Sequence, residues 1–216
     1  MFYDAARRDH GLAQDPLKSL IVPRPIGWIS TIDGQGRVNL APYSFYNAVS
    51  EFPPMVYFAI TGRYGDTPTK HSRMNAEETG EFVVNMVAGT LTEKMNITTA
   101  MVAYGIDEMK LAGLTPAPCK YVKPPRVAES PVALECTLHT TVELGDCTLV
   151  IGQVRHLAID ETMLDGNHPD IHRLRPLARL GKDEWTTLGE VRSITRIRYS
   201  DWPGHFEKPD GESPEG

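Results

Sequence analysis

The sequence contains few of the features that would place a protein in a class at once. It has three cysteines in 216 residues, Cys119, Cys136 and Cys147, and none of them forms a C-x-x-C pair. An odd number of scattered cysteines argues against a disulfide framework and against a structural zinc site. We therefore expect three reduced thiols, some of them in the core.

Long apolar runs and long basic runs are also missing. No stretch approaches the roughly 18 consecutive apolar residues of a membrane-spanning helix, and the first eleven residues are mostly polar or charged. The formal charge is −6, from 22 basic and 28 acidic residues, and the basic residues form no run that would follow a phosphate backbone. We expect a cytoplasmic protein that binds neither membranes nor nucleic acid.

Motifs of three familiar site types are absent. The chain has no G-x-G-x-x-G after a strand, no G-x-x-x-x-G-K-[ST] and no G-x-S-x-G, so a bound nucleotide would need another device to hold it. His168 and His172 are four residues apart with Asp165 and Asp170 nearby, but Pro169 favours a loop there. We expect no metal site.

What the chain does contain is many short apolar runs, separated by 17 prolines and 18 glycines. Alternation and apolar content predict strands at 26–32, 37–40, 43–50, 55–60, 81–87, 131–142, 147–159 and 191–199. Capping and proline patterns predict short helices at 68–78, from Thr90 to about residue 105, and at 107–112. Turn residues at 33–36 and 145–146 predict hairpins. Residues 160–179 show little periodicity and predict loops with one short helix.

This order of elements predicts a mainly β protein, an antiparallel barrel with inserted short helices. We expect one domain over residues 1–200, followed by an acidic tail rich in proline and glycine over residues 201–216.

Polar residues gather at turns and strand ends in two places. Ser30, Thr31, Asn39, Ser44 and Asn47 form the first group, and the second extends over residues 67–75. Hydroxyls and amides at such positions hold ligands, but they also satisfy backbone groups of loops, and both interpretations stand. Lys70 lies near the start of a predicted helix, where a positive charge and free N–H groups favour an anion; a solvated surface lysine is the alternative.

At this point the residues resemble a known family. The quoted segments are PRPIGWIST at 23–31, DG at 33–34, GRVNLAPYSFYNAVS at 36–50, PP at 53–54, and Lys70-x-Ser72-x-x-Asn75 before TGEFVVN at 79–85. They resemble the flavin reductase-like family of FMN-binding split β-barrels, which includes flavoredoxin-like proteins. The resemblance is close over residues 20–90 and loose over residues 130–195. His71 departs from the pattern, because the family usually has aspartate there.

The resemblance implies a Greek-key split barrel that forms a homodimer, with FMN near the dimer interface and NAD(P)H as its reductant. The FMN-binding residues that it implies, or that we place beside them, are Ser30, Thr31, Pro42, Tyr43, Ser44, Asn47, Ala59, Lys70, His71, Ser72, Asn75 and Arg179. Ser30 and Thr31 match the strand end along the flavin ring, whereas Lys70, Ser72 and Asn75 match the phosphate side. Hydride transfer between a nicotinamide and a flavin needs no protein acid or base, so we expect no catalytic side chain.

Three hypotheses remain open from the sequence. The first is an NAD(P)H-dependent FMN oxidoreductase that passes electrons to a monooxygenase or another acceptor. The second is an FMN-binding electron-transfer protein that nicotinamides do not reduce directly. The third is a barrel that uses the same pocket for another phosphorylated ligand. Flavin binding separates the third from the others, and reduction by NADH or NADPH separates the first from the second.

Overall fold

The computed structural model describes residues 11–12, 16–62 and 67–198. The predicted tail at 201–216 lies outside these residues. Within them the chain is mainly β, as predicted, and its largest unit is a seven-stranded antiparallel sheet in the order β3-β2-β6-β9-β10-β5-β4. The strands are β2 Gly27–Ile32, β3 Val38–Tyr43, β4 Tyr46–Glu51, β5 Pro54–Thr61, β6 Glu81–Met86, β9 Val132–Leu144 and β10 Cys147–Ile159.

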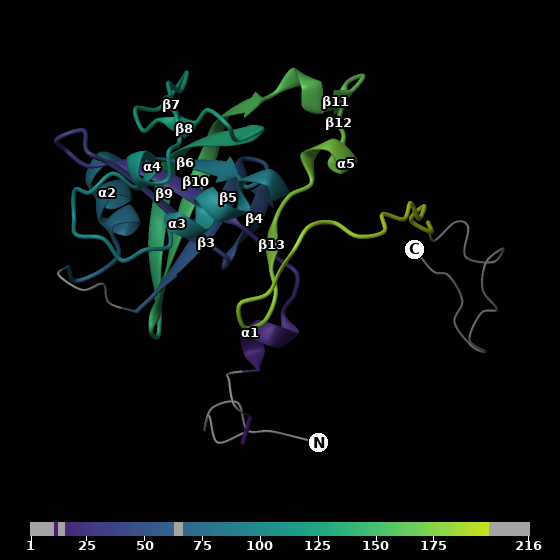
Figure 1. Cartoon of the computed structure of the whole chain (residues 1–216), viewed down its shortest axis with the longest axis horizontal. Coiled ribbons are helices and arrows are strands. Elements are labelled where there is room, and N and C mark those ends of the chain that lie inside the picture. The colour runs from purple at the N-terminus through teal and green to yellow at the C-terminus, as the bar shows by residue number, and fades with distance from the viewer. Residues whose placement is uncertain (1–10, 13–15, 63–66, 199–216) are drawn as a thin grey trace, which may run out of the picture.

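The two edge strands of the sheet are consecutive in the chain. β3 and β4 are the edge strands, yet only Ser44 and Phe45 separate them in the chain. At this corner the N–H of Ala59 on β5 donates to the carbonyl of Phe45 over 2.8 Å, which extends the β4–β5 ladder into the corner. The result is a barrel closed on one side by a chain corner rather than by a full strand ladder (Figure 1).

Alternation along β2 divides the core into two parts. Trp28 points to one cluster with Leu40, Met95 and Met109, whereas Ile29 points to the barrel interior with residues such as Phe58. Trp28 and Ile29 are both fully buried, because helices cover the outer side of the strand. β2 therefore behaves as a central strand with two buried faces, and its polar residues are buried with it.

The helices are short. They are α1 Leu17–Leu20, α2 His71–Thr79, η1 Gly89–Leu91, α3 Thr92–Ile97, α4 Glu108–Leu111, η2 Glu161–Met163 and α5 Ile171–Leu174. Figure 1 shows α2, α3 and α4 on one side of the barrel, with α5 set apart beyond its other side.

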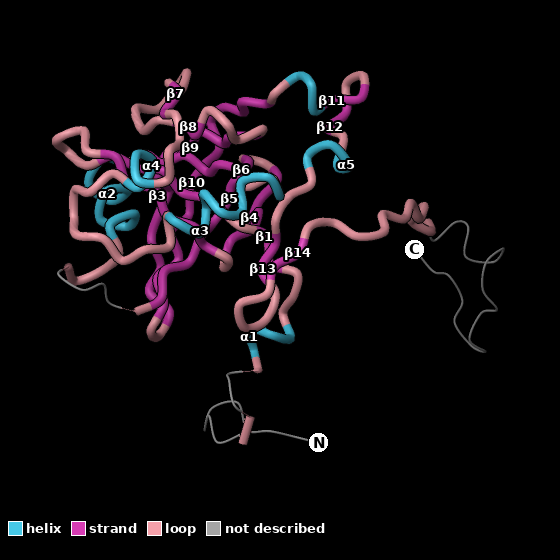
Figure 2. Tube along the Cα trace, in the orientation of Figure 1, coloured by secondary structure: helices cyan, strands magenta, loops and turns pink. Residues whose placement is uncertain are grey.

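Short strands complete the structure. They are β1 Arg24–Pro25, β7 Pro116–Ala117, β8 Arg126–Val127, β11 Leu164–Asp165, β12 His168–Pro169, β13 Ala178–Arg179 and β14 Trp185–Thr186. β1, β13 and β14 form a small sheet that lies close to α1 in Figure 2.

Three predicted elements differ from the structure. The strand predicted at 191–199 is wrong, because residues 191–198 are irregular and Ile194 is 84% exposed. Its alternation marks an apolar face, but a strand also needs a neighbouring strand. The helix predicted at 68–78 begins at His71 instead, since the hydroxyl of Thr67 donates to the carbonyl of Thr69 and Lys70 is extended.

The helix predicted from Thr90 is shorter than expected and ends at Ile97. Thr90 does not cap this helix. The residue at its N-cap is Leu91, whose side chain forms no capping hydrogen bond. The short helix predicted at 107–112 is confirmed as α4, which the Asp107 carboxylate caps by accepting from the N–H of Lys110.

Candidate functional site

A pocket of about 440 Å³ lies beside the β3–β4 corner. Its lining residues are Lys18, Ser19, Arg24, Pro42, Tyr43, Ser44, Phe45, Ala59, Thr61, Lys70, Arg179, Leu180 and Lys182. Five of these carry a positive charge, and none of the lining residues in the described part of the chain carries a carboxylate. We call it the cationic pocket. Six of the twelve predicted site residues line it: Pro42, Tyr43, Ser44, Ala59, Lys70 and Arg179.

Lys70 directly precedes α2, and it lines the cationic pocket. Its ammonium nitrogen lies 5.5 Å from the centre of the Tyr43 ring, so the charge sits over an aromatic face. Burial lowers the pKa of Lys70, because moving a charged amine out of water is unfavourable. An anion in the pocket would offset that cost, and the positive end of α2 adds to the attraction.

Arg24 is a pocket residue that the sequence analysis did not assign to the site. It is 6% exposed, and its guanidinium donates to the carbonyls of Lys18, Ile21 (2.9 Å) and Leu180 (2.9 Å). Its Nε lies 3.4 Å from the hydroxyl of Ser44. All these acceptors are neutral, and burial together with the neighbouring charge of Arg179 lowers its pKa. An arginine between two prolines inside an apolar run was the signal available in the sequence.

A buried polar network lies behind the pocket wall. Ser72 accepts from Asn39 over 2.9 Å and from the hydroxyl of Tyr43 over 3.0 Å. Deeper in, Thr31 accepts from Asn75 over 3.1 Å, and Asn75 accepts from Tyr104 over 3.1 Å. Of the residues predicted to bind FMN, Thr31, Ser72 and Asn75 therefore hold other side chains in place, and Tyr43 is the member that reaches the cationic pocket.

Ser30 and Asn47 lie outside the cationic pocket. Ser30 is fully buried and donates to the carbonyl of Pro125 over 2.6 Å, while it accepts from Asn85 over 3.1 Å. Asn47 is exposed on β4, where its side chain accepts from the N–H of Ala48. The structure thus places one of these residues in the core and the other on the surface.

A smaller cavity of about 90 Å³ adjoins the cationic pocket through Pro42, Tyr43 and Lys70. His71 and Glu108 also line it. His71 is 4% exposed and packs edge-on against the ring of Tyr104 at 4.9 Å. The position where the family usually has aspartate is therefore a buried imidazole beside the cavity.

Glu108 is a second residue that the sequence analysis did not name. It is 3% exposed, and its carboxyl oxygen accepts from the N–H of Leu40 over 2.9 Å. Burial raises its pKa to about 7, despite that hydrogen bond. No spacing rule would have found it, because a lone glutamate on a four-residue helix looks like an ordinary surface residue.

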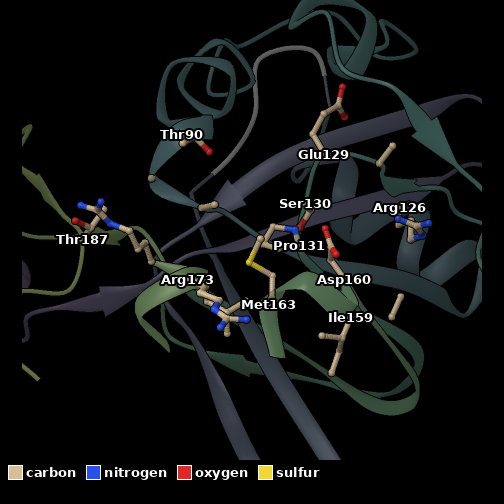
Figure 3. Close-up of a pocket in the computed structure, with 16 residues that line it drawn as sticks. Thr90, Arg126, Glu129, Ser130, Pro131, Ile159, Asp160, Met163, Arg173 and Thr187 are labelled. Atoms are coloured by element: carbon tan, nitrogen blue, oxygen red, sulfur yellow. The ribbon is translucent and has the colours of Figure 1, made fainter. Parts of the chain in front are cut away.

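A larger cavity, of about 670 Å³, lies elsewhere and contains none of the predicted site residues (Figure 3). Figure 3 shows Arg126 and Arg173 on opposite sides of it. Its two carboxylates have partners within the chain: Asp160 accepts from Thr162 over 2.9 Å, and Glu129 accepts from the N–H of Thr115 over 3.1 Å. A mixed-charge lining of this kind suits an anionic ligand less well than the cationic pocket does.

The described residues give two further findings. They contain no group of three or more His, Cys, Asp and Glu placed to hold a metal ion. None of their helices has the length and apolar character needed to cross a bilayer.

Comparison with known proteins defines the class of the fold first. A solved structure of nitrilotriacetate monooxygenase component B from Bacillus cereus is similar to this chain, with a TM-score of 0.79 and 29% identity over 87% of this chain and 96% of that protein. A protein with a split barrel domain from Shewanella frigidimarina has a TM-score of 0.75 and 23% identity, covering 84% of this chain and 90% of its own. The barrel is a split β-barrel, as predicted.

The sequence comparisons then define the family. An uncharacterized protein of Aquifex aeolicus is 40% identical over 75% of this chain and 83% of its own length. The family model described as "Flavin reductase like domain" matches residues 19–177. The chain therefore belongs to the flavin reductase-like domain family, which confirms the resemblance that the sequence motifs indicated.

Proposed function

We propose that this protein is an NAD(P)H-dependent FMN oxidoreductase that binds FMN in the cationic pocket. The observation that carries the proposal is the pocket itself: a cavity within a flavin reductase-like domain that gathers five basic residues and no carboxylate among its described lining residues. A flavin is supported by family membership, whereas the nicotinamide reductant is our inference.

The pocket's residues fit the chemistry of FMN. The phosphate of FMN is a dianion, and the ammonium of Lys70 and the hydroxyl of Ser44 are suitable donors to it. Tyr43, Phe45, Pro42 and Ala59 supply apolar surface for a planar ring. The buried positive charges are retained without an anionic side chain, which is expected where a ligand brings the anion.

Bound FMN would supply the two-electron chemistry, accepting a hydride from a reduced nicotinamide. The chain's own contribution is binding, orientation and exclusion of water. Lys70 would hold the phosphate, Tyr43 would pack against the flavin, and the network through Ser72 fixes the hydroxyl of Tyr43. We assign no acid, base or nucleophile to a side chain.

Three further parts of the proposal concern assembly and partners. We propose that the protein is a homodimer, and that it delivers its electrons to a separate acceptor. Its structural relative from Bacillus cereus is named as a component of a monooxygenase, which supports an oxygenase as that acceptor. A nicotinamide reductant favours the cytoplasm as the compartment.

The test is a titration of the purified protein with FMN, followed by anaerobic addition of NADH or NADPH while the flavin absorbance is recorded. We expect FMN to bind, and one of the two nucleotides to bleach the bound flavin. Failure to bind FMN would overturn the whole proposal. Binding without reduction by either nucleotide, but with reduction by a protein donor, would replace the oxidoreductase by an electron carrier.

A variant of Lys70 tests the assigned pocket. Lys70→Gln removes a charge-assisted contact to the phosphate, so we expect FMN affinity to fall about tenfold. Lys110→Gln is the matched control, because its side chain is 82% exposed on α4 and does not line the cationic pocket. Equal affinities of the two variants would move the FMN site away from Lys70.

A further inference from the structure

The cationic pocket holds two arginines that face each other across neighbouring strands. Arg24 on β1 and Arg179 on β13 are directly opposed in the antiparallel register, so both side chains leave the same face of the small sheet. Opposed like charges are unfavourable, and the charge of Arg179 is one cause of the lowered pKa of Arg24. Such a pair suits a site in which an anion lies between the guanidiniums.

The chain offers these guanidiniums little negative charge within the pocket. The acceptors of Arg24 are carbonyls and a hydroxyl. Arg179 donates to the carbonyl of Lys182 and, over 3.2 Å, to Asp183, whose side chain is fully exposed and screened by water. Trp185 stacks on the Arg179 guanidinium at 4.3 Å and fixes its plane.

The number and position of the charges indicate more than one anionic group. A single FMN phosphate brings about two negative charges, whereas the pocket carries five positive ones. Lys70 lies before α2. Lys182, which is exposed, and Arg179, whose side chain is 25% exposed, come from β13 and the turn after it, where the pocket opens to solvent. Both follow residue 177, where the family match ends.

We propose that Arg24, Arg179 and Lys182 form a second anion subsite, which takes the phosphates of the nicotinamide dinucleotide while Lys70 serves the FMN phosphate. This inference rests on the proposed function and deepens it by locating the co-substrate. The hydrogen bonds of Arg179 within the chain use Nη2, so its Nε and Nη1 N–H groups can donate to a diphosphate, while Arg24 contributes its positive charge beside them. A co-substrate that must enter and leave in each cycle is well served by charges at the pocket mouth.

The test uses the FMN-loaded protein and ADP-ribose, which carries the diphosphate but no nicotinamide, so no reduction follows. Calorimetric titration of wild type, Arg179→Gln, Lys182→Gln, Lys70→Gln and Arg192→Gln compares the two subsites. Arg192 is the matched control, because its side chain is 73% exposed and pairs with Glu190, outside the lining of the pocket. Arg24 is left unchanged, since its buried bonds to three carbonyls support the fold.

We expect Arg179→Gln to weaken ADP-ribose binding by about tenfold and Lys182→Gln by a smaller factor, with FMN affinity unchanged in both. Lys70→Gln should show the reverse pattern, and Arg192→Gln should match wild type. A titration with 2′-phospho-ADP-ribose tests whether the subsite also binds the extra phosphate of NADPH. If it does, Arg179→Gln should lose more affinity for this probe than for ADP-ribose.

Two outcomes would overturn the subsite. In one, FMN-loaded wild type binds neither probe, although NADH or NADPH reduces its flavin. In the other, Arg179→Gln loses FMN affinity as Lys70→Gln does, but it keeps its affinity for ADP-ribose. Arg179 and Lys70 would then belong to one site for the FMN phosphate. A failure of the proposed function is distinct, because it appears as absent FMN binding or as flavin that neither nucleotide reduces.

Discussion

Lys70 and Ser72 are two residues apart at the start of α2, yet their surroundings differ. Lys70 is half-buried and lines the cationic pocket, whereas Ser72 is 1% exposed and accepts two hydrogen bonds. We expect Ser72→Ala to lower the free energy of unfolding of the FMN-free protein by about 1–3 kcal/mol, because a buried acceptor is lost. Lys70→Gln should change it by less than about 1 kcal/mol.

Urea unfolding of the FMN-free variants measures this difference. Ser193→Ala is the control, because Ser193 is an exposed serine in the irregular stretch after β14. Its free energy of unfolding should stay within about 0.5 kcal/mol of wild type. An unchanged stability of Ser72→Ala would mean that its two hydrogen bonds contribute nothing net. Ser72 would then be free to serve the ligand directly, as the family resemblance implied.

Glu108 makes the stability of the fold depend on pH. Its pKa rises from 4.5 to about 7 through burial, so between these values the folded chain keeps a proton that the unfolded chain has lost. The free energy of unfolding therefore falls as pH rises through this range, by at most about 3 kcal/mol from this group. Glu108→Gln keeps a side-chain acceptor for the N–H of Leu40 and removes the titration.

We expect Glu108→Gln to match wild type near pH 4.5 and to exceed its stability above pH 7. Urea unfolding of both proteins across this range checks the sign. A variant that loses stability relative to wild type as pH rises would show that the ionised carboxylate stabilises the fold, contrary to this account.

At the scale of elements, the packing of β10 against β6 depends on a glycine. A methyl group at Gly152 would lie 2.3 Å from the ring of Phe82 and 3.2 Å from the carbonyl of Thr137. Phe82 is fully buried and cannot move away easily. We expect Gly152→Ala to destabilise the protein by about 1–3 kcal/mol, as overpacking of cores does.

Thermal or urea unfolding measures this effect, with Gly189→Ala as the control. Gly189 has open space around it and no positive φ, so its substitution should change stability by less than about 0.5 kcal/mol. If Gly152→Ala were equally harmless, the ring of Phe82 would have to shift freely within the barrel.

The elements also show what a sequence can and cannot predict. Strands such as β2, β9 and β10 were predictable, because alternation and turn residues act over a few neighbouring positions. The cationic pocket was only partly predictable. Lys70 and Tyr43 belong to continuous motifs, whereas Arg24 and Arg179 meet only through the pairing of β1 with β13, 155 residues apart in the chain. Local patterns carry no information about that pairing, nor about the burial that shifts the pKa of Glu108.

At the scale of the whole molecule, one face of the barrel has an apolar groove of about 510 Å³ between β4, β5 and β10. Met55, Val56, Leu134, Val154 and Leu157 supply its apolar lining. β4 beside it is an edge strand of the sheet. Leu157 is 62% exposed, and Phe52 at the β4–β5 turn is 95% exposed. Apolar surface beside an open edge favours association, so we assign this face to the proposed homodimer.

Leu157→Asp tests this assignment, because a dimer would have to bury its carboxylate among apolar side chains. We expect the variant to shift the wild-type dimer to monomers in sedimentation equilibrium, with at least about a tenfold weaker association. Leu111→Asp is the matched control, since Leu111 is 53% exposed on α4, outside the groove. A variant that stays dimeric would move the interface to another face, and a monomeric wild type would remove the dimer from the proposal while leaving the cationic pocket within one chain intact.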